Sequence, residues 1–170
     1  MVKKKELILG LISIFLILSM VSTANATTAD KPAAFGVGTF LHEHEGEQCN
    51  HFFTFNIVNG EQSDSWLYNP NGHFFMICKH DNVIHMIAKS DEIQRFKVME
   101  VQGGLKAIFE GLATVKHMDA DWEGGWVFMV EAFDYDGTGE DFIHIMFIDP
   151  DGMEHHMEGT LTSGNIVIKK

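Results

Sequence analysis

Short apolar runs that alternate with polar positions dominate the sequence after residue 34. The runs are rich in Phe, Val and Ile, and turn-forming Gly, Asn and Asp interrupt them about every ten residues. No segment shows the longer period of an amphipathic helix. The pattern therefore predicts an all-β fold, either an antiparallel β-sandwich or a flattened barrel, of about eight to ten short strands. The expected strands lie near residues 35–41, 51–58, 73–78, 82–89, 94–101, 104–115, 125–133, 141–148, 152–158 and 164–169.

The segment LKAIFEGLATV indicates how the core is filled. On a strand, Phe109 and Val115 lie on one face with the other apolar residues of the segment, whereas Lys106 lies on the opposite face. The later run GWVFMVEAF has the same alternation, beginning with Trp126. We expect these two strands to pair through a turn near residues 117–125, with Trp126 in the core rather than on a carbohydrate-binding surface.

The first residues have the pattern of a signal peptide. Three lysines at 3–5 precede an apolar stretch over 7–21, and Ala-Asn-Ala at 24–26 supplies the small residues that a signal peptidase accepts. An uncleaved N-terminal anchor is the alternative, although the apolar stretch is shorter than the roughly 20 residues of a membrane span. We therefore expect a protein that is secreted, on the cell surface or periplasmic. The expected organisation is a signal peptide over 1–26, a short tail over 27–34 and one domain over 35–170.

The chain is strongly acidic, and this narrows the choice of partners. Its formal net charge is −12, and loss of the first 26 residues removes three lysines and one glutamate, which makes the charge about −14. Binding to nucleic acid depends on clustered Lys and Arg, so we exclude nucleic acid as a partner. Cations and an unknown component of a cell surface or matrix remain as candidate partners.

Two cysteines, Cys49 and Cys78, follow the signal peptide. In an oxidising compartment an even pair is most simply one disulfide, which would close a loop and remove roughly 3–4 kcal/mol of unfolded-chain entropy. The alternative is a metal-binding or redox pair of thiols, although the spacing is not that of a C-x-x-C motif.

Three segments together resemble a known family. FEGLATV, GWVFMVEAFDYDGTGEDFIHIMFIDPDG and the terminal GNIVIKK are similar to a small secreted β-domain that follows choice-of-anchor domains in bacterial and archaeal surface proteins. The resemblance covers residues 90–169 and extends less clearly over 35–90. It implies a β fold without defined catalytic residues. The chain departs from the family at residues 116–119, in its cysteine pair and in the sequence HEHE.

The segment AFDYDGTGEDFIHI places four carboxylates between two apolar runs. Asp134, Asp136, Glu140 and Asp141 supply the hard oxygen ligands that calcium prefers, which predicts a weak calcium site. The segment is not an EF-hand, because Ile145 stands where the closing Glu belongs. A β-turn between strands explains Asp-Gly without any ion, and this alternative stays open.

Histidines near residue 45 give a second candidate ion site. His42 and His44 are two residues apart, so they project from one face of a strand, and His51 can return on the neighbouring strand. Three imidazoles in this arrangement predict a zinc or copper site. The alternative is that LHEHEGE is a solvated end of a strand.

No catalytic motif is present in the sequence: it contains neither G-x-S-x-G nor H-E-x-x-H, and no phosphate-binding glycine loop. We therefore expect a secreted or cell-surface, non-enzymatic binding or structural module, which binds calcium weakly if it binds an ion at all. The alternative is an extracytoplasmic zinc or copper protein that uses the His-x-His site.

Overall fold

The computed structural model of the protein describes residues 31–44, 46–58, 67–68, 70–135 and 140–170. These residues form nine β-strands, and every pairing between neighbouring strands is antiparallel. The expected signal peptide lies outside the described residues. The strands are β1 (Ala33–His44), β2 (Glu47–Val58), β3 (Leu67–Tyr68), β4 (Asn71–His80), β5 (Val83–Val101), β6 (Gly104–His117), β7 (Trp122–Tyr135), β8 (Phe142–Ile148) and β9 (Glu154–Lys169).

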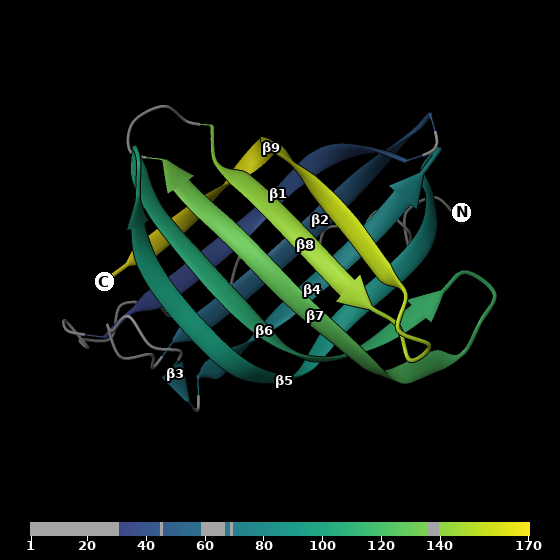
Figure 1. Ribbon diagram of the computed structural model, residues 1–170. Coiled ribbons are helices and arrows are strands. Elements are labelled where there is room, and N and C mark those ends of the chain that lie inside the picture. The colour runs from purple at the N-terminus through teal and green to yellow at the C-terminus, as the bar shows by residue number, and fades with distance from the viewer. Residues whose placement is uncertain (1–30, 45, 59–66, 69, 136–139) are drawn as a thin grey trace, which may run out of the picture.

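Eight of the nine strands form a closed up-and-down barrel (Figure 1). Each long strand pairs with the next long strand along the chain, β9 pairs with β1, and the short β3 pairs with β5 outside this cycle. The pairing of β5 with β6 runs from Met86↔His117 to Val101↔Gly104 and completes the ring. The expected all-β antiparallel fold is confirmed. The structure has one closed sheet rather than the two packed sheets of a sandwich.

The strands are longer than the sequence pattern indicated. The runs expected at 82–89 and 94–101 are one strand, β5, whose pairing with β6 shifts register between Ser90 and Glu92 and again between Ile93 and Arg95. A β-bulge of this kind breaks the alternation of inward and outward side chains and bends the strand. In the sequence, the loss of alternation looks the same as a turn.

Aromatic side chains fill the barrel interior. Alternate residues of the long strands point inward, as expected for a small barrel, except where β5 is irregular. The strand formed by LKAIFEGLATV has its alternate apolar residues on the inner face as predicted, and it pairs with β7. Trp126 is 4% exposed, which confirms that it belongs to the core. The buried phenylalanines are Phe40, Phe53, Phe55, Phe74, Phe96, Phe109, Phe128 and Phe147.

Gly111 permits the bend that closes the barrel. A Cβ atom at this position would collide with the backbone of Glu92, which lies at the irregular part of β5. A glycine therefore allows β6 to approach the bent strand closely.

Within the described part of the chain, the structure has no helix long and apolar enough to cross a membrane.

Candidate metal centre

One end of the barrel carries two cysteines and two histidines on its inner face. We call it the cysteine–histidine end and define it by His42, Cys49, His51 and Cys78. It is at the right of Figure 1, where the arrows of β4 and β8 end. His42 pairs with Cys49 between β1 and β2, and His51 pairs with Cys78 between β2 and β4. Cys49 and His51 are two residues apart on β2, so the four side chains belong to one face of three adjacent strands.

His51 is the most unusual residue of this end. It is 2% exposed, and its ring stacks on Phe40 with centroids 4.8 Å apart. Neither Nδ1 nor Nε2 has a hydrogen-bond partner. Burial, followed by the nearby imidazole of His42, lowers the pKa of His51 to about 4. At neutral pH the ring is therefore uncharged, which is the form that binds metals.

His42 lies next to His51 and closer to the solvent. The two ring centroids are 6.0 Å apart, and the rings meet edge to face. Nδ1 of His42 lies 3.4 Å from both the backbone N and the backbone O of Glu158 on β9. This contact directs the ring towards β9. His44 is the last residue of β1, and its side chain lies outside the described part of the structure.

The expected disulfide is absent from the structure, in which Cys49 and Cys78 are free, half-buried thiols. Burial raises the pKa of Cys78 to about 12, with smaller contributions from the neighbouring thiol of Cys49. Cys49 lies one residue beyond the last ladder pair, Asn50↔Lys79, and is therefore diagonal to Cys78. Diagonal Cβ atoms are about 7 Å apart in a regular ladder, whereas a disulfide needs about 3.5–4.5 Å.

Further polar and sulfur side chains surround these four residues. Met86 pairs with Cys78 on one side and with His117 on the other, and it packs against the hydrophobic core. The rings of His80 and His85 have centroids 5.6 Å apart, and Nε2 of His80 lies 3.4 Å from Glu47. In the sequence these residues are scattered. The signal that could have grouped them is the meander topology, because each lies beside a turn at the same end of the barrel.

The candidate ligand atoms at the cysteine–histidine end do not converge on a common point. Among the residues that the structure describes, no group of three His, Cys, Asp or Glu side chains is arranged to hold a metal ion. The register brings Cys49, His51 and Cys78 to adjacent inner positions, and side-chain rotation would have to gather their ligand atoms. The prediction from sequence joined His51 to His42 and His44. It treated the cysteines as a separate disulfide or metal-binding pair and did not place them on the same face.

The predicted calcium residues lie at the opposite end, which we call the acidic end and define by Asp134 and Asp141. Oδ2 of Asp141 accepts a hydrogen bond from the backbone N–H of Ile166 at 2.7 Å, and Oδ2 of Asp134 accepts one from Ile168 at 2.8 Å. Asp141 is 6% exposed. These carboxylates thus attach β9 to β7 and β8 where the regular ladder has ended. Asp136 lies outside the described residues, so the calcium site stays a prediction.

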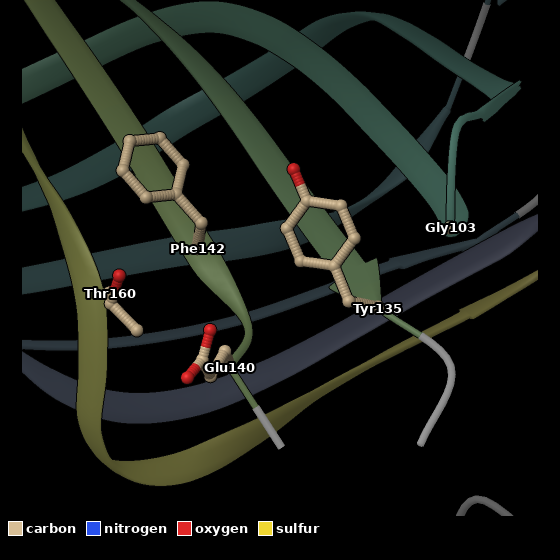
Figure 2. A pocket seen from close by; sticks show the side chains of 5 residues that line it. All are labelled: Gly103, Tyr135, Glu140, Phe142 and Thr160. Carbon is tan, nitrogen blue, oxygen red and sulfur yellow. The ribbon is translucent and has the colours of Figure 1, made fainter. Parts of the chain in front are cut away.

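Glu140, the fourth predicted calcium ligand, is exposed and lies beside a shallow depression. The depression has a volume of about 340 Å³. Figure 2 shows the rings of Tyr135 and Phe142 above the carboxylate of Glu140, with Thr160 at the side. A single carboxylate among these side chains does not form a catalytic acid–base pair.

The outer face of the barrel carries a second pair of histidines. Nε2 of His144 lies 3.1 Å from Nδ1 of His156, and the two rings are nearly parallel. Glu131 lies 3.6 Å from His144, and Glu154 lies 3.2 Å from His156. Each imidazole therefore has a partner, in contrast to His51.

No family model, no curated protein and no solved structure matches the chain.

Proposed function

We propose that the protein is an extracytoplasmic transition-metal binding protein, for zinc or copper, rather than an enzyme. The proposed ligands are Cys49, His51 and Cys78, with His42 as the fourth. The observation that carries the proposal is the buried imidazole of His51, whose two nitrogens have no partner beside a pair of thiols. The location outside the cytoplasm rests on the signal-peptide pattern of residues 1–26.

The burial of His51 has an energetic cost that packing alone does not explain. A buried polar group without a partner costs about 1–3 kcal/mol. Phenylalanine would fill the same position without this penalty, and the ring already stacks on Phe40 as an aromatic side chain does. Violations of this kind are concentrated at functional sites, where a ligand compensates for them. A metal ion bound to one ring nitrogen would remove the penalty.

The diagonal placement of the thiols suits a metal better than a disulfide. Two sulfurs at about 2.3 Å from a tetrahedral zinc ion are about 3.8 Å apart, whereas a disulfide bond is about 2.05 Å long. Two thiolates and two imidazoles form a donor set that is typical of zinc or copper. The two thiols are free and lie diagonally across β2 and β4.

Metal binding would have to displace thiol protons. The raised pKa of Cys78 means that this thiol is protonated in the metal-free protein at neutral pH. Thiolates, not thiols, are metal ligands, so binding is expected to release protons and to strengthen as the pH rises. His51 needs no such deprotonation, because burial keeps its ring neutral.

Metal content tests the proposal directly. Reduced protein without a histidine tag is loaded with zinc, desalted and analysed for bound metal. We expect about one equivalent in the wild type and less than about 0.2 in His51→Phe, because one of the three central ligands is lost. His73→Phe is the matched control, since His73 is exposed at the other end of β4. Equal binding by wild type and His51→Phe would overturn the proposal.

The surface-module function and the resemblance to the secreted β-domain stay predictions. An acidic exported barrel that binds a metal is compatible with both, because a metal site on a stable scaffold does not exclude attachment to a cell surface.

A further inference from the structure

We infer that the depression at the acidic end binds an organic cation, namely an ammonium group that carries methyl or other alkyl substituents. In this site the rings of Tyr135 and Phe142 contact the alkyl groups, and the carboxylate of Glu140 faces the charge (Figure 2). The depression lies at the end of the barrel opposite to the proposed metal ligands. The inference therefore goes beyond the proposed function and does not depend on it.

Three aromatic side chains lie together on the outer face of β7 and β8. Phe133 and Tyr135 are two residues apart on β7, and Phe142 pairs with Phe133 in the β7–β8 ladder. The ring of Phe142 is inclined at 70° to that of Phe133, with centroids 5.6 Å apart. The ring of Tyr135 is inclined at only 20° to that of Phe133, with centroids 5.8 Å apart. The rings of Tyr135 and Phe142 are therefore not parallel, and both line the depression.

The size of the depression and the rest of its lining suit a small ligand. Its volume of about 340 Å³ lies within the range of about 300–1,000 Å³ that is usual for small-molecule sites. Gly103, in the turn between β5 and β6, leaves the edge of the Tyr135 ring open, since a Cβ atom there would lie 3.7 Å from Cδ1 of Tyr135. Thr160 pairs with Phe142 in the β8–β9 ladder and adds a hydroxyl. The contact groups are thus two rings, one carboxylate and one hydroxyl.

The charges around the depression favour a cation. Among the residues that the structure describes, none forms an ion pair or a hydrogen bond with the exposed carboxylate of Glu140. Nζ of Lys106 lies 4.9 Å from the centre of the Phe133 ring, and Glu131 compensates its charge at 2.6 Å. The aromatic cluster thus already contacts one ammonium group, and Glu140 supplies a countercharge for another. The formal net charge of −12 also attracts cations.

The lining indicates an alkylated ammonium group rather than a metal ion or a bare ammonium group. Calcium needs six to eight oxygen ligands, and among the described lining residues only Glu140 carries a carboxylate. A bare ammonium group has several N–H donors that need acceptors. Alkyl groups need only apolar contact, and aromatic rings within about 6 Å of a cation attract its charge, as in the sites that bind quaternary ammonium groups. An alkylated ammonium group therefore matches this lining.

Binding of choline tests the inference. Its neutral isostere, in which a tert-butyl group replaces the trimethylammonium group, is the matched control ligand. Both compounds are titrated into the wild-type protein and followed by NMR chemical shifts. We expect saturable binding of choline in the millimolar range and binding of the isostere that is at least about fivefold weaker, because only choline carries the charge. Equal binding of the two compounds, or no saturable binding of choline, would overturn the inference.

Matched variants locate the site. Glu140→Gln and Phe142→Leu should each weaken choline binding about threefold, because the first removes the countercharge and the second removes an aromatic face. The controls are Glu43→Gln, which changes an exposed carboxylate at the cysteine–histidine end, and Phe75→Leu, which changes a half-buried phenylalanine on β4. Both controls should bind choline as the wild type does, and thermal denaturation checks that every variant is folded. Equal weakening in site variants and controls would overturn the inference.

Vesicles of phosphatidylcholine distinguish two sources of the ammonium group. Cosedimentation that free choline inhibits would support a lipid headgroup as the ligand. Binding of choline without cosedimentation would support a free ammonium compound. None of these results affects the proposed metal site, because its residues are not part of the depression.

Discussion

The two ends of the barrel differ in whether their buried polar side chains have hydrogen-bond partners. At the acidic end, the carboxylates of Asp134 and Asp141 accept backbone hydrogen bonds from β9 at 2.7–2.8 Å. At the cysteine–histidine end, His51 is buried to a similar degree and neither ring nitrogen has a partner. A satisfied buried group stabilises the fold, whereas an unsatisfied one is a cost that another property of the molecule must explain. Carboxylates that resemble a ligand cluster in the sequence can thus serve as hydrogen-bond acceptors for the backbone. A single buried imidazole without a partner can indicate where a ligand is to be sought.

The largest effect is expected at the acidic end. Asp141→Ala should lower the free energy of unfolding by about 3 kcal/mol, because it leaves a cavity and deprives the buried N–H of Ile166 of its acceptor. Urea denaturation at neutral pH measures the change. Glu140→Ala is the control, since Glu140 is exposed, and it should change the free energy by less than about 0.5 kcal/mol. Equal, small effects of both substitutions would show that Asp141 does not hold β9.

The second-largest effect is expected at the cysteine–histidine end, where the free energy of unfolding should depend on pH through His51. The pKa of His51 is lowered from 6.5 to about 4 in the folded protein, so the unfolded chain binds the extra proton first. Titration of His51 therefore leaves the free energy of unfolding unchanged above about pH 6.5. As the pH falls from 6.5 towards 4, it lowers the free energy of unfolding by about 3 kcal/mol in total. Denaturation of the metal-free wild type between pH 7 and pH 4 measures it.

His51→Phe serves as the reference in that experiment, because other groups also titrate. Asp149, for example, has its pKa lowered, chiefly by the hydrogen bond that it accepts from the backbone N–H of Met153. The difference between wild type and His51→Phe isolates the contribution of His51. Identical pH profiles of the two proteins would contradict the assignment.

A smaller effect is expected for the same substitution at a single pH. At pH 7 and without metal, His51→Phe should raise the free energy of unfolding by about 1–2 kcal/mol, because a partnerless polar ring becomes an apolar one of similar shape. Thermal and urea denaturation measure the gain. Phe40→Leu provides a test of packing, since it keeps the imidazole and removes its stacking partner, and it should destabilise. A loss of stability in His51→Phe would mean that the imidazole has a structural role.

The smallest effect is expected for calcium. Two of the four predicted ligands are engaged with the backbone of β9, so calcium in the millimolar range should raise the melting temperature by no more than about 2 °C over chelator. A shift of more than about 5 °C that disappears in Glu140→Ala would show instead that the acidic end is an ion site.

Much of the fold could be predicted from the sequence, because the alternation of inward and outward side chains is local. The inner positions of β6 and the burial of Trp126 follow from it directly. The sequence pattern could not decide between a sandwich and a closed barrel, because closure depends on the pairing of β1 with β9, at opposite ends of the described chain. The irregular pairing between Ser90 and Arg95 also interrupts the alternation and made one strand look like two.

The candidate site was only partly predictable for a related reason. The H-x-H spacing indicated His42 and the return strand indicated His51, because both are within one hairpin. The place of Cys78 and Met86 beside them depends on the registers of β2 with β4 and of β4 with β5. The predicted signal peptide and the even number of cysteines favoured a disulfide, whereas the structure has two free thiols in a diagonal register.

The meander topology has a consequence for how substitutions affect the cysteine–histidine end. Four hairpins reach the cysteine–histidine end, namely those that join β1 to β2, β4 to β5, β6 to β7 and β8 to β9 (Figure 1). Each hairpin brings its own polar side chains to the rim of a barrel whose interior is packed with phenylalanines. A substitution within one hairpin can therefore change the side chains at this opening while the other three hairpins keep their pairing.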